Sequence, residues 1–507
     1  MSPPGRPKGE FRSAQHEGTS VSPPGRPKGE FRSAQHEGTS VSQPTPRLLW
    51  APQAWVGGGW QPRVQMAIGA DGCFSHIAVD VPAAADAYPL PGPVLPGLVN
   101  AHSHAFQRAF VGLAERREAA QDDFWSWRDR MYAVALRITP DQLRAVASQL
   151  YAELLQGGYT QVCEFHYLQH APDGQRYANA AEMSLALVDA ARAVGIGLTL
   201  LPVLYERAGF AQPDLRADQR RFASTVDEVL ALRDTVRALR LPHIDAGVAI
   251  HSLRAARAES ITHLLQALGD GFGPGAAPIH IHIAEQTGEV DDCLAATGQR
   301  PIAWLAEHVA LDARWQLVHA THATPDEIAD VARSGAGVVL CPSTEANLGD
   351  GLCDLPAWLS HGVPLSIGSD SQVGRQWPHE LRLLDYGQRL ALRQRNVAAA
   401  PQHGMPSTAA HLFNRCLAGG AAAAGFKSWG IQAGARADLL VLDAAAPGLL
   451  GLPGSHALDG LVFGTDGPAF AEVWVAGQRR VLGARAEGGA AIAQRFSRAA
   501  AELLGDA

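Results

Sequence analysis

The sequence predicts an α/β protein: a (β/α)8 TIM barrel accompanied by a small β-sandwich that both chain ends form. Eight short apolar runs alternate with Ala- and Leu-rich stretches that are long enough to hold helices. Continuous apolarity is typical of parallel strands that are covered on both faces, and eight such units in succession favour a barrel. Alternating runs divided by Gly and Pro occur before and after this region, as expected for small antiparallel strands.

The expected elements follow one another along the chain. The first sandwich strands are expected in LLWAPQAWV, RVQMAIGADG and FSHIAVD. The barrel strands are expected at 94–101, 159–165, 198–205, 246–251, 278–285, 314–320, 336–341 and 363–370. The last sandwich strands are expected at 437–443 and 471–482. These runs predict two sandwich parts, a barrel and a C-terminal helix, with the boundaries 47–93, 425–485, 94–424 and 486–507.

The first residues of the chain form an exact repeat, since residues 2–21 recur without change at 22–41. The repeated segment is polar and rich in Pro, Gly and Ser, so it cannot bury enough apolar surface to offset the entropy of ordering it. We therefore expect residues 1–46 to be a disordered tail outside the folded part.

Composition and charge exclude several classes of function. Hydrophobic residues make up 47% of the 507 residues, which is ample for a large core. The net charge of −8 provides no basic field that could hold nucleic acid. Neither a signal-like start nor a run of about 20 apolar residues occurs, so a cytoplasmic protein without a membrane partner is expected. The six cysteines include no C-x-x-C pair and are expected to be reduced thiols.

Residues that can bind a metal lie at the ends of four of the eight expected strands. They are His102 and His104 on the first, His280, His282 and Glu285 on the fifth, His319 and His322 on the sixth, and Asp370 on the eighth. Because barrel sites form at the C-terminal ends of the strands, we expect these groups to converge. Taken singly, an H-x-H pair is also typical of a polar loop, and Asp370 could cap a helix. In combination they indicate a metal site of imidazoles and a carboxylate.

The same residues resemble those of the amidohydrolase superfamily, and within it the branch that deaminates amidines and heterocycles. That resemblance implies one metal ion with four protein ligands, and three residues with catalytic roles. The implied ligands are His102, His104, His282 and Asp370, and the implied catalytic residues are Glu285, His319 and Asp370. The family pattern, and not strand periodicity, selects His282 over His280 and His319 over His322.

The shortage of lysine favours a single metal ion. Binuclear relatives usually bridge two metals with a carbamylated lysine on a barrel strand. Here no lysine occurs between residues 29 and 426, so no expected barrel strand can supply one. The expected cofactor is therefore one Zn²⁺ per chain, although His and Asp ligands also suit Fe²⁺ or Mn²⁺.

Longer stretches resemble the N-formimino-L-glutamate deiminases, a family of enzymes of bacterial histidine degradation. The resemblance runs from about Leu48 to about Leu482. It rests on VNAHSHAFQRAF, LPVLYERAGF, IHSLRA, HIHIAEQ, LVHATHAT, TEANLGDG and GSDSQV. It implies zinc-dependent hydrolysis of a small-molecule substrate to N-formyl-L-glutamate and ammonia, and a homodimer. It also places five residues near the substrate, namely Gln107, Arg128, Tyr167, His251 and Arg254.

Two of these residues fit a substrate with two carboxylates. Arginine binds carboxylates through two parallel hydrogen bonds. Arg254 lies just beyond the fourth expected strand, and Arg128 lies in the aromatic segment 124–132 after the first. In that segment Trp125 and Trp127 are expected to pack rather than to contact the substrate. In the expected mechanism zinc activates water, Asp370 orients it or accepts its proton, Glu285 moves a proton to the leaving nitrogen, and His319 stabilises charge.

Two alternatives remain open at this stage. Another aminohydrolase of the same architecture, such as a guanine-type deaminase or an imidazolonepropionase, would act on a flat heterocycle and would need ring-edge contacts more than carboxylate clamps. A non-catalytic barrel that binds a metal or a metabolite is the alternative of a different class. Structural zinc sites are usually closed by four protein ligands, mostly cysteines. Ligands at an open barrel mouth, with Glu285 to spare, favour catalysis instead.

Overall fold

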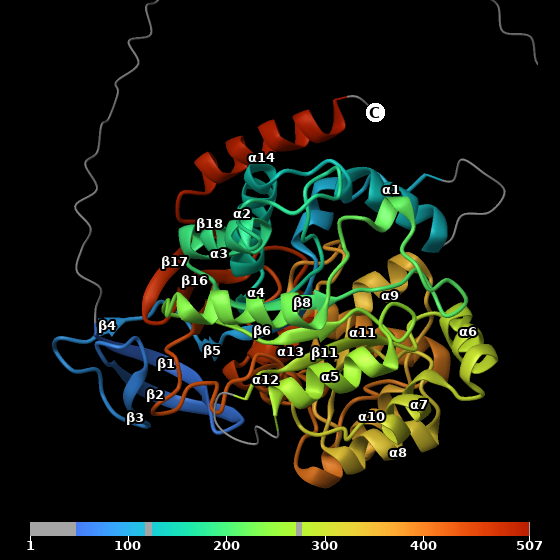
Figure 1. Cartoon of the computed structure of the whole chain (residues 1–507). Helices are drawn as coiled ribbons and strands as arrows, with labels where there is room; N and C mark the ends of the chain where they lie inside the picture. Colours follow the sequence, from blue (N-terminus) through green and yellow to red (C-terminus); the bar gives the residue numbers. More distant parts are fainter. Residues whose placement is uncertain (1–46, 117–123, 270–275, 506–507) are drawn as a thin grey trace, which may run out of the picture. The chain divides into compact units, whose positions relative to one another are not determined.

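The computed structural model describes residues 47–116, 124–269 and 276–505 (Figure 1). The expected tail at 1–46 lies outside the described residues. Within them the strands form two sheets, one parallel and one mixed. No helix in this part of the chain combines the length and the apolar composition that crossing a membrane requires.

The parallel sheet is a closed ring of eight strands. In ring order these are β6 (Leu98–Ser103), β7 (Tyr159–His166), β8 (Gly197–Leu204), β10 (Val248–Ile250), β11 (Ile279–Ile283), β12 (Trp315–His319), β13 (Gly337–Leu340) and β14 (Leu365–Ile367). The short β9 (Ile244–Ala246) pairs with β8 just before β10. A parallel bridge between Ser103 and Asp370 joins the last strand to the first. The predicted barrel is therefore confirmed.

The barrel strands are buried along their whole length, which explains their continuous apolarity. Every residue of β7, β8 and β11 is buried, because side chains on one face fill the barrel and those on the other meet the helices. Threonine capping boxes begin three of these covering helices. The three are α2 (Pro140–Gln156), α4 (Val226–Ala238) and α8 (Pro325–Ser334).

The first barrel strand begins later than the sequence predicted, since the run at 94–101 is divided in the structure. Its first part, β5 (Val94–Pro96), belongs to the other sheet, where it pairs with β1 (Leu48–Val56) and β15 (Leu439–Leu442). Gly97 then leads into β6. A Cβ at Gly97 would lie 2.2 Å from the Oγ1 atom of Thr160, so only glycine allows the chain to pass from one sheet to the other here.

The second sheet is built from both ends of the folded chain, as predicted. Its remaining strands are β2 (Gly59–Ile68), β3 (Phe74–Ala78), β4 (Tyr88–Pro89), β16 (Phe470–Val475), β17 (Gln478–Leu482) and β18 (Arg485–Ala486). A buried ion pair between Arg436 and Asp438 ties this sheet to the barrel, because Arg436 also donates to Gln161 of β7. The final helix, α14 (Gly489–Leu504), lies beside α2 (Figure 1).

Candidate active site

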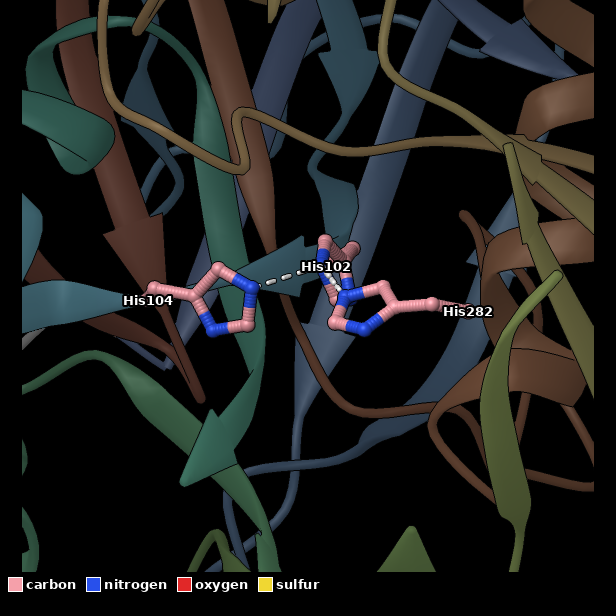
Figure 2. Close-up of side chains that lie close together, drawn as sticks. All are labelled: His102, His104 and His282. Atoms are coloured by element: carbon pink, nitrogen blue, oxygen red, sulfur yellow. Dashed lines mark hydrogen bonds between the residues drawn. The ribbon is translucent and has the colours of Figure 1, made fainter. Parts of the chain in front are cut away.

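The four predicted metal ligands meet at the mouth of the barrel. The Nε2 atom of His102 lies 3.2 Å from that of His104 and 3.0 Å from that of His282, and the three rings point toward one another (Figure 2). The Oδ1 atom of Asp370 is 3.3 Å from the Nε2 atoms of both His102 and His104. Zinc–nitrogen bonds of about 2.0–2.1 Å in a tetrahedral site place the ligand atoms roughly 3.3 Å apart. The observed spacing therefore fits a single metal ion.

Hydrogen bonds determine which ring nitrogens face the centre of this group. The Nδ1 atom of His104 lies 2.9 Å from the carbonyl oxygen of Phe165, and that of His282 lies 2.9 Å from the carbonyl oxygen of His251. A carbonyl only accepts, so each Nδ1 carries the proton and each Nε2 presents a lone pair. Both lone pairs face the Nε2 atom of His102, and a cation at the centre of the three rings would accept a lone pair from each ring. The donor set therefore fits a divalent metal.

Burial keeps the imidazoles in the form that binds metal. It lowers the pKa of His102 to about 3, and it lowers the pKa values of His104 and His282 as well. The three rings are therefore neutral near pH 7, as ligation requires. Burial opposes ionisation of Asp370, but hydrogen bonding and charge interactions with the histidines outweigh it and lower the Asp370 pKa.

Glu285 and His319 lie beside the four ligands. The Nε2 atom of His319 is 3.6 Å from Oε1 of Glu285 and 3.7 Å from Oδ2 of Asp370. Burial raises the pKa of Glu285 to about 7, so this carboxyl group can gain and lose a proton near neutral pH. Burial opposes protonation of His319, but Glu285, Glu345 and Asp370 outweigh it and raise the His319 pKa to about 10. The pair is suited to moving a proton beside the metal ligands.

The backbone at these strand ends is strained. Five non-glycine residues there have φ in the left-handed region, which such residues seldom adopt. They are Ala284 (+50°), His319 (+67°), Ala320 (+47°), Asp370 (+46°) and Gln372 (+71°). Strain of this kind collects at functional sites, where the fold holds side chains in one required direction.

Two buried glutamates that sequence reasoning did not single out hold the site in place. The Oε1 atom of Glu345, on α9 (Pro342–Leu348), lies 3.3 Å from the Nδ1 atom of His319. Glu164, on β7, accepts hydrogen bonds from Ser103 Oγ at 2.8 Å and from the backbone N–H of Ala105. Glu164 thus holds the side chain of Ser103 and the backbone of Ala105, the two neighbours of His104 in the chain. Nothing in their spacing along the sequence marks either glutamate.

A pocket opens beside the predicted ligands, with an empty volume of about 690 Å³ that includes its open mouth. All five predicted substrate residues line it, namely Gln107, Arg128, Tyr167, His251 and Arg254. Sequence reasoning missed further lining residues, which include Met131, Tyr132, Tyr205, Gln219 and Phe222. Trp127, which was expected to pack, lines the pocket and also contacts Phe110, while the side chain of Trp125 lies outside the described residues. A signal existed for Tyr205, because it directly follows the third barrel strand.

The predicted substrate residues also contact one another and the metal ligands. Gln107 Nε2 donates to the hydroxyl of Tyr167 at 3.3 Å, and the Tyr167 ring lies 5.1 Å from the ring of His104. The ring of His251 lies 5.2 Å from that of His282. The buried Nε atom of Arg254 has no hydrogen-bond partner among the residues that the structure describes. The pocket therefore has the predicted metal ligands at one end and a guanidinium that can bind an anion in its wall.

Comparison with known proteins identifies the family. Residues 94–480 match the amidohydrolase family. A formimidoylglutamate deiminase of Pseudomonas aeruginosa is 46% identical over 457 residues, which are 90% of this chain and 99% of that protein. A crystal structure of an amidohydrolase from Brucella melitensis aligns with a TM-score of 0.84 and 41% identity over 90% of this chain and 100% of that one. An adenosine deaminase of Xanthomonas campestris with bound zinc aligns with a TM-score of 0.73 over 90% of this chain and 98% of that one, and at 23% identity it bears on the fold alone. This chain belongs to the amidohydrolase family.

Proposed function

We propose that this protein hydrolyses N-formimino-L-glutamate to N-formyl-L-glutamate and ammonia. The observation that carries the proposal is the pocket, which His104, His282 and Asp370 of the predicted ligand set line together with Arg128 and Arg254. Similarity to a formimidoylglutamate deiminase over 90% of the chain supports the same substrate. A flat heterocycle has no carboxylate that a guanidinium group could bind.

We infer that the resident metal is a single zinc ion held by His102, His104, His282 and Asp370. The distances between the ligand atoms and the neutral imidazoles support this assignment. Zinc in such a site acts as a Lewis acid and lowers the pKa of water toward about 7. Metal analysis of the purified protein tests the assignment. We expect one equivalent of zinc per chain. One equivalent of iron or manganese would show that another metal ion occupies the same ligands.

The protein's own residues move the protons that hydrolysis requires. Water adds to the formimino carbon, and Asp370 and Glu285 are placed to orient it and accept its proton. Glu285 gives this first proton to the terminal nitrogen, and the hydroxyl proton of the tetrahedral adduct follows through Asp370 and Glu285, so that the carbon–nitrogen bond breaks, ammonia leaves and a carbonyl group remains. Protonated His319 donates to the oxygen on which negative charge develops. The proximity of Glu285 Oε1 to His319 Nε2, at 3.6 Å, supports this division of roles.

The remaining predicted residues bind and orient the substrate. Arg254 and Arg128 bind the two carboxylates, since their planar donors match a carboxylate in geometry and charge. Gln107, Tyr167 and His251 line the pocket beside the metal ligands, where they can hold the formimino nitrogen and the nearer carboxylate.

The division of the folded chain is also a proposal. We propose the division that the sequence predicts with one change, namely a sandwich from residues 47–96 and 425–485, a barrel from 97–424, and a C-terminal helical segment from 486–507. The pairing of β5 with β1 supports moving residues 94–96 to the sandwich. Limited proteolysis tests this division, because the first cuts should fall between these parts rather than within them.

We further propose that the protein is a cytoplasmic homodimer that binds neither nucleic acid nor membrane. The net charge of −8 supports the absence of a nucleic-acid partner. Sedimentation equilibrium tests the oligomeric state, since a dimer has twice the chain mass of 53.7 kDa.

The decisive experiment is ammonia release by purified, zinc-loaded protein from N-formimino-L-glutamate, with a panel of purines and an imidazolone measured beside it. We expect turnover of N-formimino-L-glutamate alone. Turnover of a heterocycle without turnover of N-formimino-L-glutamate would overturn the substrate assignment and would leave the barrel and the metal ligands intact.

A further inference from the structure

A pair of tyrosines in the pocket is held by one glutamine. Tyr132, on α1 (Phe124–Ala135), and Tyr205, just after β8, both line the pocket and are each 5% exposed. Gln219, at the end of η2 (Ala217–Gln219), is 1% exposed. Its Nε2 atom lies 2.9 Å from the hydroxyl of Tyr205 and 3.4 Å from the hydroxyl of Tyr132.

The Gln219 side chain has a single orientation. Its Oε1 atom accepts a hydrogen bond from the backbone N–H of Arg216 at 3.0 Å, and an N–H group can only face the amide oxygen. The amide NH₂ group must therefore face the two tyrosines. Both hydroxyl oxygens consequently act as acceptors toward Gln219.

Each tyrosine hydroxyl still has its own proton to donate. Within the described part of the chain, the only acceptor for either proton is the oxygen of the other tyrosine. That arrangement uses one of the two protons. At least one hydroxyl proton is therefore left without an acceptor among the described residues, so it is available to a group bound in the pocket.

The tyrosine pair lies farther from the metal ligands than the predicted substrate residues do. The ring of Tyr205 is 4.4 Å from that of His251, and it is the His251 ring that contacts His282. Tyr132 contacts Phe222, and Phe222 in turn contacts Tyr167. Each tyrosine thus reaches the ligands through at least one intervening ring. A substrate carboxylate that meets this pair must be distant from the reacting carbon.

The surroundings of the pair favour an anion. The Arg128 guanidinium lies 5.6 Å from the centre of the Tyr132 ring. Burial raises the pKa of Tyr205, although the positive charges of Arg254 and Arg128 oppose the rise. The Tyr205 hydroxyl therefore keeps its proton at neutral pH. A neutral hydroxyl beside guanidinium groups is a suitable donor to a carboxylate, which only accepts.

We propose that Tyr205 and Tyr132, oriented by Gln219, donate a hydrogen bond to the side-chain carboxylate of the substrate and so select for that second carboxylate. The contact with Gln219 is shorter for Tyr205 than for Tyr132, so the Tyr205 hydroxyl is the more firmly oriented of the two, and we expect it to be the main donor. This assignment rests on the proposed function. It adds the two tyrosines to the arginines as residues that recognise the distal carboxylate of the substrate.

The test removes the Tyr205 hydroxyl and the distal carboxylate, separately and together. Tyr205→Phe keeps the ring, and N-formimino-L-norvaline replaces the distal carboxylate of N-formimino-L-glutamate by a methyl group. A hydrogen bond to a charged group corresponds to a factor of about 10 to 100. We expect Tyr205→Phe to lose about that factor in kcat/KM on N-formimino-L-glutamate, mainly through KM, and at most about threefold on the norvaline compound. Tyr132→Phe should show the same pattern with a smaller loss.

Two outcomes overturn the assignment, namely no loss on N-formimino-L-glutamate or an equal loss on both substrates. The urea unfolding midpoint of each variant is compared with that of the wild type, and equal midpoints show that the variant is folded, so that an equal loss on both substrates counts against the assignment. Tyr386→Phe, on α11 (Trp377–Leu392) and 38% exposed, controls for the substitution itself and should match the wild type. Absence of wild-type turnover of N-formimino-L-glutamate would instead refute the proposed function, and the tyrosine assignment with it.

Discussion

The two ends of the pocket are built in different ways. The metal end is the end with the predicted metal ligands, and the outer end is the end with Tyr132, Tyr205 and Gln219. At the metal end, the side chains leave the ends of barrel strands, and backbone carbonyls fix the rings of His104 and His282. At the outer end, Tyr132 and Gln219 come from α1 and η2, which lie in the connections between strands, and side-chain contacts hold them. A sheet of hydrogen-bonded strands fixes the chemistry, while loops that can vary without disturbing the sheet determine what is bound. Substitutions at the metal end should therefore lower kcat for every substrate. The loss of activity caused by substitutions at the outer end should depend on which substrate is used.

Glu285→Gln should have the largest effect and tests the metal end. Loss of the group that moves the proton should lower kcat by a factor of about 10² to 10⁴, while KM changes little. The variant should keep one equivalent of metal, because Glu285 is not among the predicted ligands. Ammonia release and metal analysis check both expectations, with the exposed Glu307→Gln as the control. Turnover at the wild-type rate would show that another group moves the proton.

The metal end could be predicted from sequence because strand geometry constrains it. Residues at the C-terminal ends of parallel strands must meet at one edge of the barrel, so His102, His319 and Asp370 could be placed together although they are far apart in the chain. The choice of His282 over His280 needed the family pattern, because residues two apart on a strand share a face. In the structure His280 lies deeper and contacts the carbonyl oxygen of Ala423.

The outer end could be predicted only in part. Tyr205 directly follows β8 and Arg254 lies four residues after β10, so their positions at the mouth could be predicted from the strand pattern. Tyr132 and Gln219 lie in long connections, whose path over the barrel depends on tertiary packing and not on local periodicity. The hydrogen-bond partners of Glu164 and Glu345 likewise depend on how these side chains are buried beneath the strand ends. The spacing of residues along the sequence does not predict them.

Arg254→Gln should have the next largest effect. It should also show whether substrate binding at the outer end can be lost without a loss of the chemistry at the metal end. Removing one partner of a buried ionic contact costs about 2 to 5 kcal/mol, so kcat/KM for N-formimino-L-glutamate should fall by a factor of about 30 or more. Formamidine lacks both carboxylates, and its slow hydrolysis should be the same in the variant and the wild type. Arg333→Gln, on the exposed side of α8, is the matched control. An equal loss on formamidine would mean that Arg254 acts on the chemistry and that the two ends are not separable.

Glu345→Gln should have a smaller effect, again at the metal end. Glu345 holds His319 through Nδ1, and loss of an outer partner of this kind lowers activity by about 10- to 100-fold. The loss should appear in kcat and not in KM, with the metal content unchanged. Glu345→Asp should recover part of the activity, because it keeps a carboxylate acceptor for His319. Loss of metal, or a loss in KM alone, would contradict a positioning role.

The smallest expected effect concerns stability and tests the support beneath the metal end. Burial raises the pKa of Glu164 to about 8 from an ordinary value of 4.5, although hydrogen bonds from Ala105, Ser103 and Tyr151 oppose the rise. Between these two pH values the folded state holds a proton that the unfolded state releases. Stability from this group is therefore full below about pH 4.5 and falls as the pH rises toward 8, by on the order of 1 kcal/mol per pH unit. Glu164→Gln lacks this proton, so its free energy of unfolding should rise relative to the wild type across that range.

Urea unfolding at pH 5.5, 6.5 and 7.5 measures this difference, with Glu153→Gln as a control of opposite character. Glu153 pairs with Arg108 and Arg375, and these contacts outweigh the effect of burial and lower its pKa. It is therefore ionised in both states over this range, and the difference between its variant and the wild type should not change with pH. A flat difference for Glu164→Gln as well would mean that Glu164 is ionised in the folded protein. The backbone around His104 would then be held by a charged group, and the metal end would owe its position to electrostatics as much as to the sheet.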